Sequence, residues 1–386
     1  MGRTIAHGTF RNLDETAGKL MARRRTLMTA LAASLVFPLA ACGGDDGGDT
    51  GGGDTGGGAQ AEGMVGVILP DTESSPRWES FDRPLLEAAF EEAGVEYDIQ
   101  NAQGDAQQMQ TIANQMITSG VTVLAIVNLD NASGAQIQDQ AAQQGVATID
   151  YDRLTLGGSA EYYVSFDNTE VGRLQGQGLA DCLGPEPANI AFLNGSPDDS
   201  NATLFSEGAH EVLDPMTQYT QVAEQAVPGW EPTEALTIFE QMYTQQGGDI
   251  QGVLAANDTL ANAVIQVLAR NNQAGQVPVT GQDASVEGLQ NILANRQCMT
   301  VYKPAAEEAD ALAELAIALI NGEEDPNIIN GESEDPEGDR TVPSVLLDPV
   351  SITRDNVSQV VEDGQVSAAD LCTGEYAAAC TELGIQ

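Results

Sequence analysis

Short runs of β-branched and other apolar residues alternate with helix-length amphipathic segments from Met64 onward. Glycine follows several of the helical segments, as at Gly94 and Gly145, and glycine readily ends a helix. In the first half we expect strands at 65–69, 95–100, 121–127 and 146–150, with helices at 78–93, 106–119 and 132–144. This alternation predicts a parallel sheet with helices on both faces.

The alternation continues in the second half, after a strand at 162–166. An acidic stretch with glycine and proline, 322–340, is predicted to be a loop. We expect helices at 169–182, 202–213, 233–245, 260–270 and 286–294, and strands at 190–193, 220–222, 250–255, 277–281, 298–301 and 341–347. Two successive halves of this kind predict an α/β fold with two doubly wound parallel-sheet lobes.

The N-terminus has the order of a secretory signal peptide: three arginines at 23–25, an apolar run at 27–39, then small residues. The run is too short for a comfortable membrane span. It ends in Leu-Ala-Ala-Cys42, which resembles the bacterial lipobox, where cleavage precedes a cysteine that becomes acylated. We therefore expect 1–42 to be a signal peptide with Cys42 as the lipid attachment site, or else an ordinary signal peptide that contains a cysteine. Translation starts at Met1 or Met21.

Residues 43–62 are rich in glycine and aspartate, and they are predicted to be a flexible tether because they bury no apolar surface. Four cysteines follow Cys42, an even number that suggests disulfides in an exported protein. Cys372 and Cys380 are close enough in sequence to close a small loop. Cys182 and Cys298 are then the second pair, or buried free thiols.

Charge and motifs exclude several classes of function. The chain has 15 Lys and Arg residues against 58 Asp and Glu, a formal net charge of −43, which repels nucleic acid and anionic substrates and favours a neutral, hydroxyl-rich ligand. Hydrophobic residues still make up 42%, enough for packed cores. The nucleophile elbow, zinc-protease, phosphate-loop and dinucleotide motifs are missing, and His210 lies within a predicted helix. We expect no enzyme and no cofactor, and we attribute Gly172, Gly176 and Gly178 to close helix packing.

Polar side chains follow the predicted strands at their carboxyl ends, where doubly wound sheets bind ligands. They comprise Asp71, Asn128, Asp152, Arg153, Asn194, Asn257, Asp258, Gln282 and Asp283. Asp accepts, Arg donates and Asn does both, which suits sugar hydroxyls. The chain has two tryptophans, and a loop position beside glycine and proline favours Trp230 as a stacking platform for the apolar face of a sugar ring.

These stretches resemble the periplasmic xylose-binding proteins, which belong to the ribose/galactose type of sugar-binding proteins that serve ABC importers. The resemblance covers nearly all of 63–364, and the acidic loop and the C-terminal tail depart from it. It rests on LPD at 69–71, RW at 77–78, YDRL at 151–154, YYVSFDN at 162–168, GSPDDSNA at 195–202, GW at 229–230, AND at 256–258, GQDA at 281–284 and MTVYKP at 299–304.

The resemblance implies a sugar site built from both lobes. Its members are Arg77, Trp78 and Arg153 from the first lobe, Asp199, Asn201, Trp230, Asn257 and Asp283 from the second, and Lys303 from a crossover strand. Each residue also has a simpler interpretation. Asn257 and Asp283 are placed to cap helices, and Arg153 is free to pair with a surface carboxylate.

The implied architecture is the type I periplasmic binding protein fold with a three-strand hinge near Asp167, Tyr302 and Arg340. We expect one lobe from 63–167 and 302–340, and the other from 168–301 and 341–386. The implied function is a monomeric, lipid-anchored protein at the outer face of the cell membrane that closes on a monosaccharide, D-xylose as the first candidate, and delivers it to an ABC permease.

Alternatives remain open at this level. The sugar can be another pentose or a hexose, because a misfit near C6 costs about 1–3 kcal/mol. A sugar sensor for a receptor or kinase has the same sequence features. A repressor needs a basic helix-turn-helix before Met64, where this chain has a signal peptide instead. An exported glycosidase needs a catalytic carboxylate pair, which the sequence does not single out.

Overall fold

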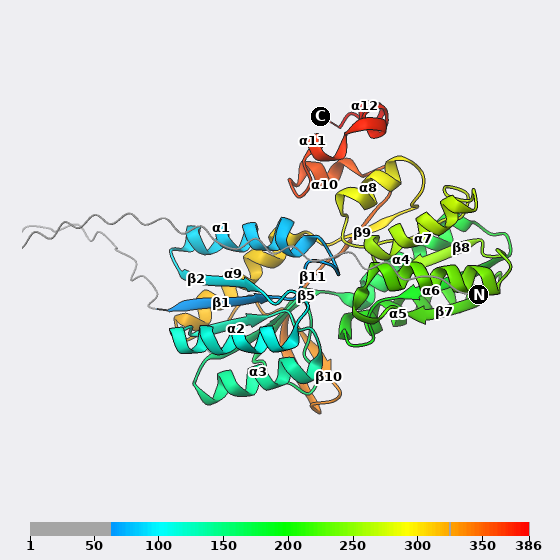
Figure 1. Cartoon of the computed structure of the whole chain (residues 1–386). Coiled ribbons are helices and arrows are strands. Elements are labelled where there is room, and N and C mark those ends of the chain that lie inside the picture. Colours follow the sequence, from blue (N-terminus) through cyan, green and yellow to red (C-terminus); the bar gives the residue numbers. More distant parts are fainter. Residues whose placement is uncertain (1–62, 324–325, 386) are drawn as a thin grey trace, which may run out of the picture. The chain divides into compact units, whose positions relative to one another are not determined.

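The computed structural model describes residues 63–323 and 326–385 (Figure 1). The predicted signal peptide, Cys42 and the predicted tether lie outside the described residues. No helix among the described residues is long and apolar enough to cross a bilayer.

The first lobe contains a seven-stranded sheet in the order β10-β11-β5-β4-β3-β1-β2. All neighbouring strands are parallel except β10, which pairs antiparallel with β11 at the edge. The strands are β1 (Met64–Leu69), β2 (Glu96–Asn101), β3 (Val123–Ile126), β4 (Ala147–Tyr151), β5 (Tyr162–Phe166), β10 (Gly331–Asp335) and β11 (Arg340–Leu347).

Helices cover both faces of this sheet, as predicted (Figure 1). One apolar core lies between the sheet and the pair α1 (Arg83–Ala93) and α9 (Ala305–Ile320). A second core lies on the opposite face, under α2 (Ala106–Ser119) and α3 (Asn131–Gln143). A short π-helical turn, η1 (Trp78–Asp82), precedes α1.

The second lobe has a parallel sheet in the order β7-β6-β8, built from β6 (Ala188–Asn194), β7 (Tyr219–Ala226) and β8 (Gly252–Ala255). Its helices again pack on both faces. They are α4 (Asn168–Leu183), α5 (Ser200–Leu213), α6 (Pro232–Gln245), α7 (Asp258–Arg270) and α8 (Val286–Leu293), with a 3-10 turn, η2 (Pro228–Trp230).

Glycine sets the spacing between α4 and α5. A Cβ added at Gly172 would overlap the backbone of Phe205, and one at Gly208 would overlap the carbonyl of Thr169. The two helices therefore approach backbone to backbone. This confirms helix packing, rather than a phosphate loop, as the reason for glycine at 172.

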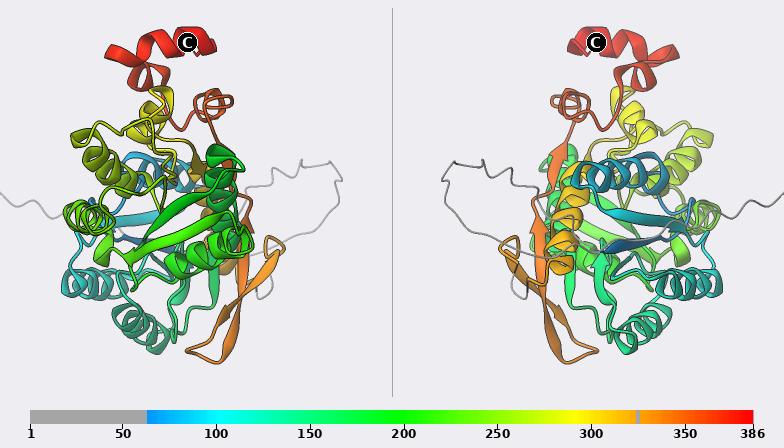
Figure 2. Two further views of the ribbon diagram at one scale, coloured as in Figure 1. Left: turned by 90° about the vertical axis from the view of Figure 1, so that its right-hand side faces the viewer. Right: turned by 90° about the vertical axis from the view of Figure 1, so that its left-hand side faces the viewer.

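The chain crosses between the lobes after β5, after β9 (Thr300–Tyr302) and between β11 and β12 (Val350–Ile352), which pairs antiparallel with β9. The C-terminus then forms α10 (Ser358–Glu362), α11 (Ala368–Leu371), the turn η3 (Gly374–Tyr376) and α12 (Ala377–Leu383), which lie next to α8 in each view of Figures 1 and 2. The three crossings form a three-strand hinge, as expected, but the third lies after Leu347 and not near Arg340, because β11 belongs to the first lobe.

The structure corrects three expectations. The assignment of 341–347 to the second lobe is wrong: β11 pairs with β5, and its Val345 is buried in the first-lobe core. The predicted loop at 322–340 contains the edge strand β10, in which Glu332 and Glu334 are exposed and Asp335 is buried. The predicted strand at 277–281 contributes an isolated bridge, Val253 to Val279.

Helix α9 was not among the predicted elements. It is alanine-rich and buried over most of its circumference, and only a narrow acidic stripe that includes Glu307, Asp310 and Glu314 is exposed.

Two disulfides are present in the described residues. Cys182 is bonded to Cys298, and Cys372 to Cys380. The first joins the end of α4 to the loop before β9, and the second closes a small loop between α11 and α12.

Candidate functional site

Side chains from both lobes line one small cavity of about 20 Å³. All nine residues of the predicted site belong to its wall: Arg77, Trp78, Arg153, Asp199, Asn201, Trp230, Asn257, Asp283 and Lys303. Five further residues complete it: Ser74, Ser75, Asp152, Phe205 and Gln282. The carboxyl ends of strands in the two lobes therefore face each other across this cavity, which we call the cleft.

Arg77 is the most heavily bonded residue of the first-lobe wall. Its Nε and Nη2 donate to Asp82, and Nη1 donates to Asp152 at 2.9 Å. Nη2 also donates to Glu308 at 2.5 Å, and all four side chains are buried. A guanidinium has five N–H groups, so one hydrogen on Nη1 is left to point at a ligand.

Trp78 lies beside this network. The guanidinium carbon of Arg77 is 4.6 Å from the center of its ring, and that of Arg153 is 5.5 Å away. Its indole N–H donates to Ser74 at 3.1 Å, and the ring packs in the first-lobe core. Trp78 therefore serves as core and cleft wall at once.

Helix N-termini present the polar residues of the second-lobe wall. Asp199 caps α5 by accepting from the backbone N–H of Asn201, and its other oxygen accepts from the indole N–H of Trp230 at 3.0 Å. The same oxygen lies 3.0 Å from Nε of Arg153 in the first lobe. Capping and a place in the cleft wall are thus combined in one residue.

The sequence left open whether Asn257 and Asp283 cap helices or belong to the cleft wall. Asn257 does cap α7, and its Nδ2 donates across the lobes to the carbonyl of Ser74 at 3.1 Å. The cap of α8 is Ser285, so the interpretation of Asp283 as a helix cap is wrong. Asp283 instead accepts from the hydroxyl of Ser75 in the first lobe at 2.9 Å.

Trp230 sits over a glycine. A Cβ at Gly195 would overlap the outer edge of its indole ring. The ring also meets Phe205 edge to face, with ring centers 6.5 Å apart. The glycine after β6 thus makes room for the ring, while Asp199 and Phe205 fix its orientation.

Lys303 links charges from both lobes. Its buried ammonium lies 3.3 Å from Asp152 and 3.9 Å from Asp283. Burial alone would raise the pKa of Asp152, but the charges of Lys303, Arg77 and Arg153 outweigh it and lower that pKa to about 2. Asp152 is therefore ionised at neutral pH.

The pKa of Glu308 is shifted in the opposite direction to that of Asp152. Burial, reinforced by the negative charges of Asp152 and Asp82, raises its pKa to about 8 against the attraction of Arg77. Its Oε2 contacts Arg77, while its buried Oε1 has no hydrogen-bond partner. Glu308 supports the cleft from behind and does not line it.

Three cleft residues other than glycine have left-handed backbone: Asp152 at φ 61°, Trp230 at φ 56° and Asp283 at φ 94°. Such conformations cost free energy and persist where the surroundings fix them, commonly at functional sites. Here they turn three side chains into the cavity just where a strand or turn ends.

Sequence reasoning missed Ser74, Ser75 and Phe205, because serine and phenylalanine in such places carry no local pattern. Gln282 and Asp152 stood among the strand-end residues and were left out of the predicted site. His210 lies away from the cleft, stacked on Phe192 and bonded to Asp214 and Glu224. Within 63–323 and 326–385, no group of three or more His, Cys, Asp or Glu residues is arranged to hold a metal ion.

Comparisons with known proteins agree with this architecture. The family described as "Periplasmic binding protein domain" matches residues 65–324. The D-xylose-binding periplasmic protein of Escherichia coli is 34% identical over 310 residues, which cover 78% of this chain and 91% of that protein. The corresponding protein of Haemophilus influenzae is 34% identical over 304 residues, covering 78% and 89%.

A solved structure gives the same result in three dimensions. The carbohydrate transporter solute binding protein of Chloroflexus aurantiacus, in complex with D-glucose, superposes with a TM-score of 0.73 at 28% identity, covering 79% of this chain and 97% of that one. These relatives bind substrates and are not enzymes. The chain belongs to the periplasmic binding protein family of type I fold, in the group that includes the D-xylose-binding proteins.

Proposed function

We propose that this protein is an extracytoplasmic lipoprotein that captures a monosaccharide in the cleft, closes on it and delivers it to an ABC permease. Its homologues are sugar-binding periplasmic proteins of ABC transporters. The observation that carries the proposal is the wall of the cleft, where donors and acceptors from both lobes surround Trp230.

The charges of the cleft support a neutral ligand. Arg77, Arg153 and Lys303 each lie against a carboxylate of the wall, so no cation is left to attract an anion. A sugar hydroxyl donates and accepts, and it inserts between such pairs without adding charge. Trp230 offers an apolar face to the C–H side of the ring.

Binding requires the lobes to separate first. A cavity of about 20 Å³ holds on the order of one water molecule. The hydrogen bonds Ser75–Asp283, Asn257–Ser74 and Ser200–Leu154 join the lobes around it. We infer that these bonds break to admit a sugar, and that contacts from the sugar to both walls then favour closure.

D-xylose is our first candidate, since two relatives of the chain are named D-xylose-binding periplasmic proteins. Another pentose or a hexose remains the alternative. Anchoring through a lipid on Cys42 is part of the proposal, and intact mass of the membrane-extracted protein tests it. A sensing role shares the cleft, and uptake of labelled sugar in a deletion strain separates import from sensing.

Calorimetry with a panel of pentoses and hexoses tests the binding proposal. We expect D-xylose to bind in the micromolar range or tighter, and Asp283→Asn to weaken it strongly. Glu240→Gln is the matched control, because Glu240 is an exposed carboxylate on the same lobe. Binding of a different monosaccharide corrects the ligand, and binding of none refutes the sugar assignment.

A further inference from the structure

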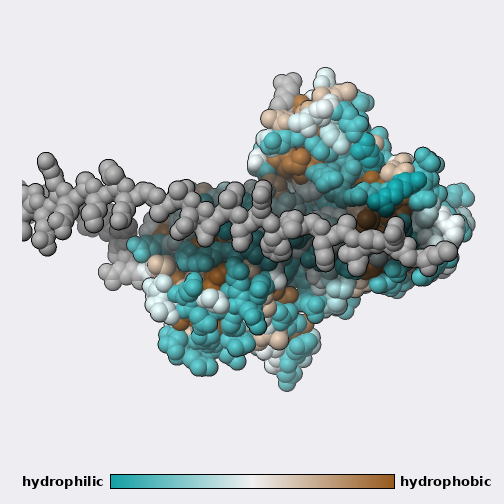
Figure 3. All heavy atoms as spheres, viewed as in Figure 1, coloured by the Kyte–Doolittle hydropathy of each residue, from teal (hydrophilic) through white to brown (hydrophobic). Residues whose placement is uncertain are grey.

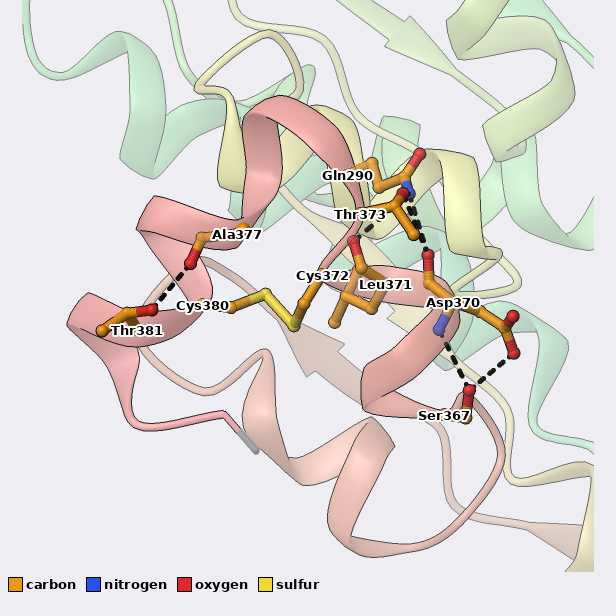
Figure 4. Close-up of a disulfide and its surroundings, with 9 residues drawn as sticks. All are labelled: Gln290, Ser367, Asp370, Leu371, Cys372, Thr373, Ala377, Cys380 and Thr381. Carbon is orange, nitrogen blue, oxygen red and sulfur yellow. Dashed lines mark hydrogen bonds between the residues drawn. A yellow bond between two sulfur atoms is a disulfide. The ribbon is translucent and has the colours of Figure 1, made fainter.

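The C-terminal segment, residues 353–385, is fixed to the second lobe. Leu289 and Ile292 of α8 share an apolar cluster with Val360 and Leu371 of the segment. Gln290 donates to the carbonyls of residues 370 and 371, both at 3.2 Å, and the Cys372–Cys380 disulfide closes the loop that follows (Figure 4). The segment must therefore move with α8.

The same segment also contacts the first lobe. Phe81, a half-exposed residue of η1, packs against the apolar cluster that the segment forms together with α8 and β9. The side-chain oxygen of Gln365 accepts from the backbone N–H of Ala305, the first residue of α9, at 2.9 Å. Burial and the nearby charge of Asp363 in the segment raise the pKa of Tyr302 in the crossover strand β9. The segment thus spans the hinge.

A groove of about 890 Å³ lies between these parts. Pro76 and Phe81 of the first lobe form one side, and residues 364–367 of the segment form another. Figure 3 shows apolar surface near the C-terminal segment within a largely hydrophilic face. Pro76 stands between Ser75 and Arg77 of the cleft wall, so any movement that opens the cleft also displaces this side of the groove.

We propose that the C-terminal segment is an interlobe brace that stabilises the closed arrangement of the lobes. While the lobes stay together, the C-terminal segment of the second lobe keeps its hydrogen bond to Ala305 of the first lobe, and the cluster that it helps to form packs against Phe81. Opening breaks these contacts, so the brace shifts the equilibrium between open and closed molecules toward the closed state. Ligand affinity then depends on side chains that lie outside the cleft.

Two variants test the brace through affinity, a readout that rests on the proposed function. Phe81→Ala and Gln365→Ala should each weaken binding of the sugar about three- to tenfold, mainly through faster dissociation. Leu85→Ala is the control, because Leu85 is a partly buried first-lobe residue that packs on the first-lobe core and is not part of the brace cluster. An equal loss in Leu85→Ala would overturn the brace.

A second measurement needs no ligand. Spin labels on Gln107→Cys and Glu234→Cys report the distance between the two lobes, because these exposed residues stand in the first turns of α2 in the first lobe and α6 in the second. We expect Phe81→Ala and Gln365→Ala to shift the ligand-free distribution to longer distances. An unchanged distribution in both variants overturns the brace. If the unaltered protein binds no monosaccharide, the proposed function fails, and this measurement still decides the brace.

Discussion

Gly195→Ala tests the sugar platform without replacing any predicted ligand contact. The new Cβ would overlap the outer ring of the Trp230 indole, so the ring has to move. Movement breaks its 3.0 Å hydrogen bond to Asp199, and bonds to charged groups contribute about 1.5–3 kcal/mol. Because Asp199 also faces Arg153, the displacement disturbs the contact between the lobes as well.

We expect a loss of affinity of about 1.5–3 kcal/mol, or roughly ten- to 150-fold in Kd. Overpacking should also lower the free energy of unfolding by about 1–3 kcal/mol. Calorimetry gives the first quantity, and urea unfolding followed by tryptophan fluorescence gives the second.

Gly252→Ala is the matched control for Gly195→Ala. It lies in β8 of the same lobe, where a Cβ meets the flexible ends of Leu183 and Leu179 at 3.0–3.2 Å. It should cost stability and leave Kd unchanged. If Gly195→Ala shows an altered Trp230 signal yet binds the sugar as tightly as the unaltered protein, Trp230 is not the platform and the reasoning is wrong.

Three further changes test the charges and crosslinks. Lys303→Met removes one of the cations beside Asp152 and the ammonium near Asp283, so affinity at pH 7 should fall about tenfold or more in calorimetry. Burial raises the pKa of Glu308 to about 8, above its value of about 4.5 in the unfolded chain. Its stabilising contribution is therefore complete below about pH 4.5 and is lost as the pH rises through 8. In Glu308→Gln, the midpoint of urea unfolding should depend less on pH between pH 5 and 8 than in the unaltered protein. Replacing both cysteines of a disulfide with serine should lower the free energy of unfolding by an amount that depends on the length of the loop it closes. On a chain-entropy basis, we expect a loss of about 5 kcal/mol for Cys182–Cys298, which spans 116 residues, and about 2.5 kcal/mol for Cys372–Cys380, which spans 8. Urea unfolding measures both losses, and equal losses would contradict the chain-entropy explanation.

The sequence was most informative where a local rule applies. Helix ends at glycine and the period of apolar residues located α2 and β5 at their observed bounds. The nine site residues meet in one cavity because the carboxyl ends of strands converge in doubly wound sheets, and the family resemblance selected them from among the strand-end polar residues.

The failures share a physical cause. Helix α9 is alanine-rich and mostly buried, with only a narrow exposed acidic stripe, and Glu308 lies on its buried side. A carboxylate on an unrecognised helix, 231 positions from the Arg77 it contacts, leaves no local trace. β11 has an ordinary strand pattern, and nothing within 341–347 tells which lobe it joins; pairing with β5 decides that.

The two walls of the cleft are built on different principles, and this bears on how the protein releases its ligand. The buried Arg77–Asp82 ion pair and the hydrogen bond from Arg77 to Glu308 fix the first wall, and breaking such buried contacts is costly, so this wall should keep its geometry when the lobes part. The second wall consists of helix caps and Trp230, which are fixed within their own lobe. What changes on opening is therefore the set of contacts between the walls: Ser75–Asp283, Asn257–Ser74, Arg153–Asp199 and Lys303–Asp283. A permease that separates the lobes would break these contacts and those to the sugar together, and release would need no rearrangement within either wall.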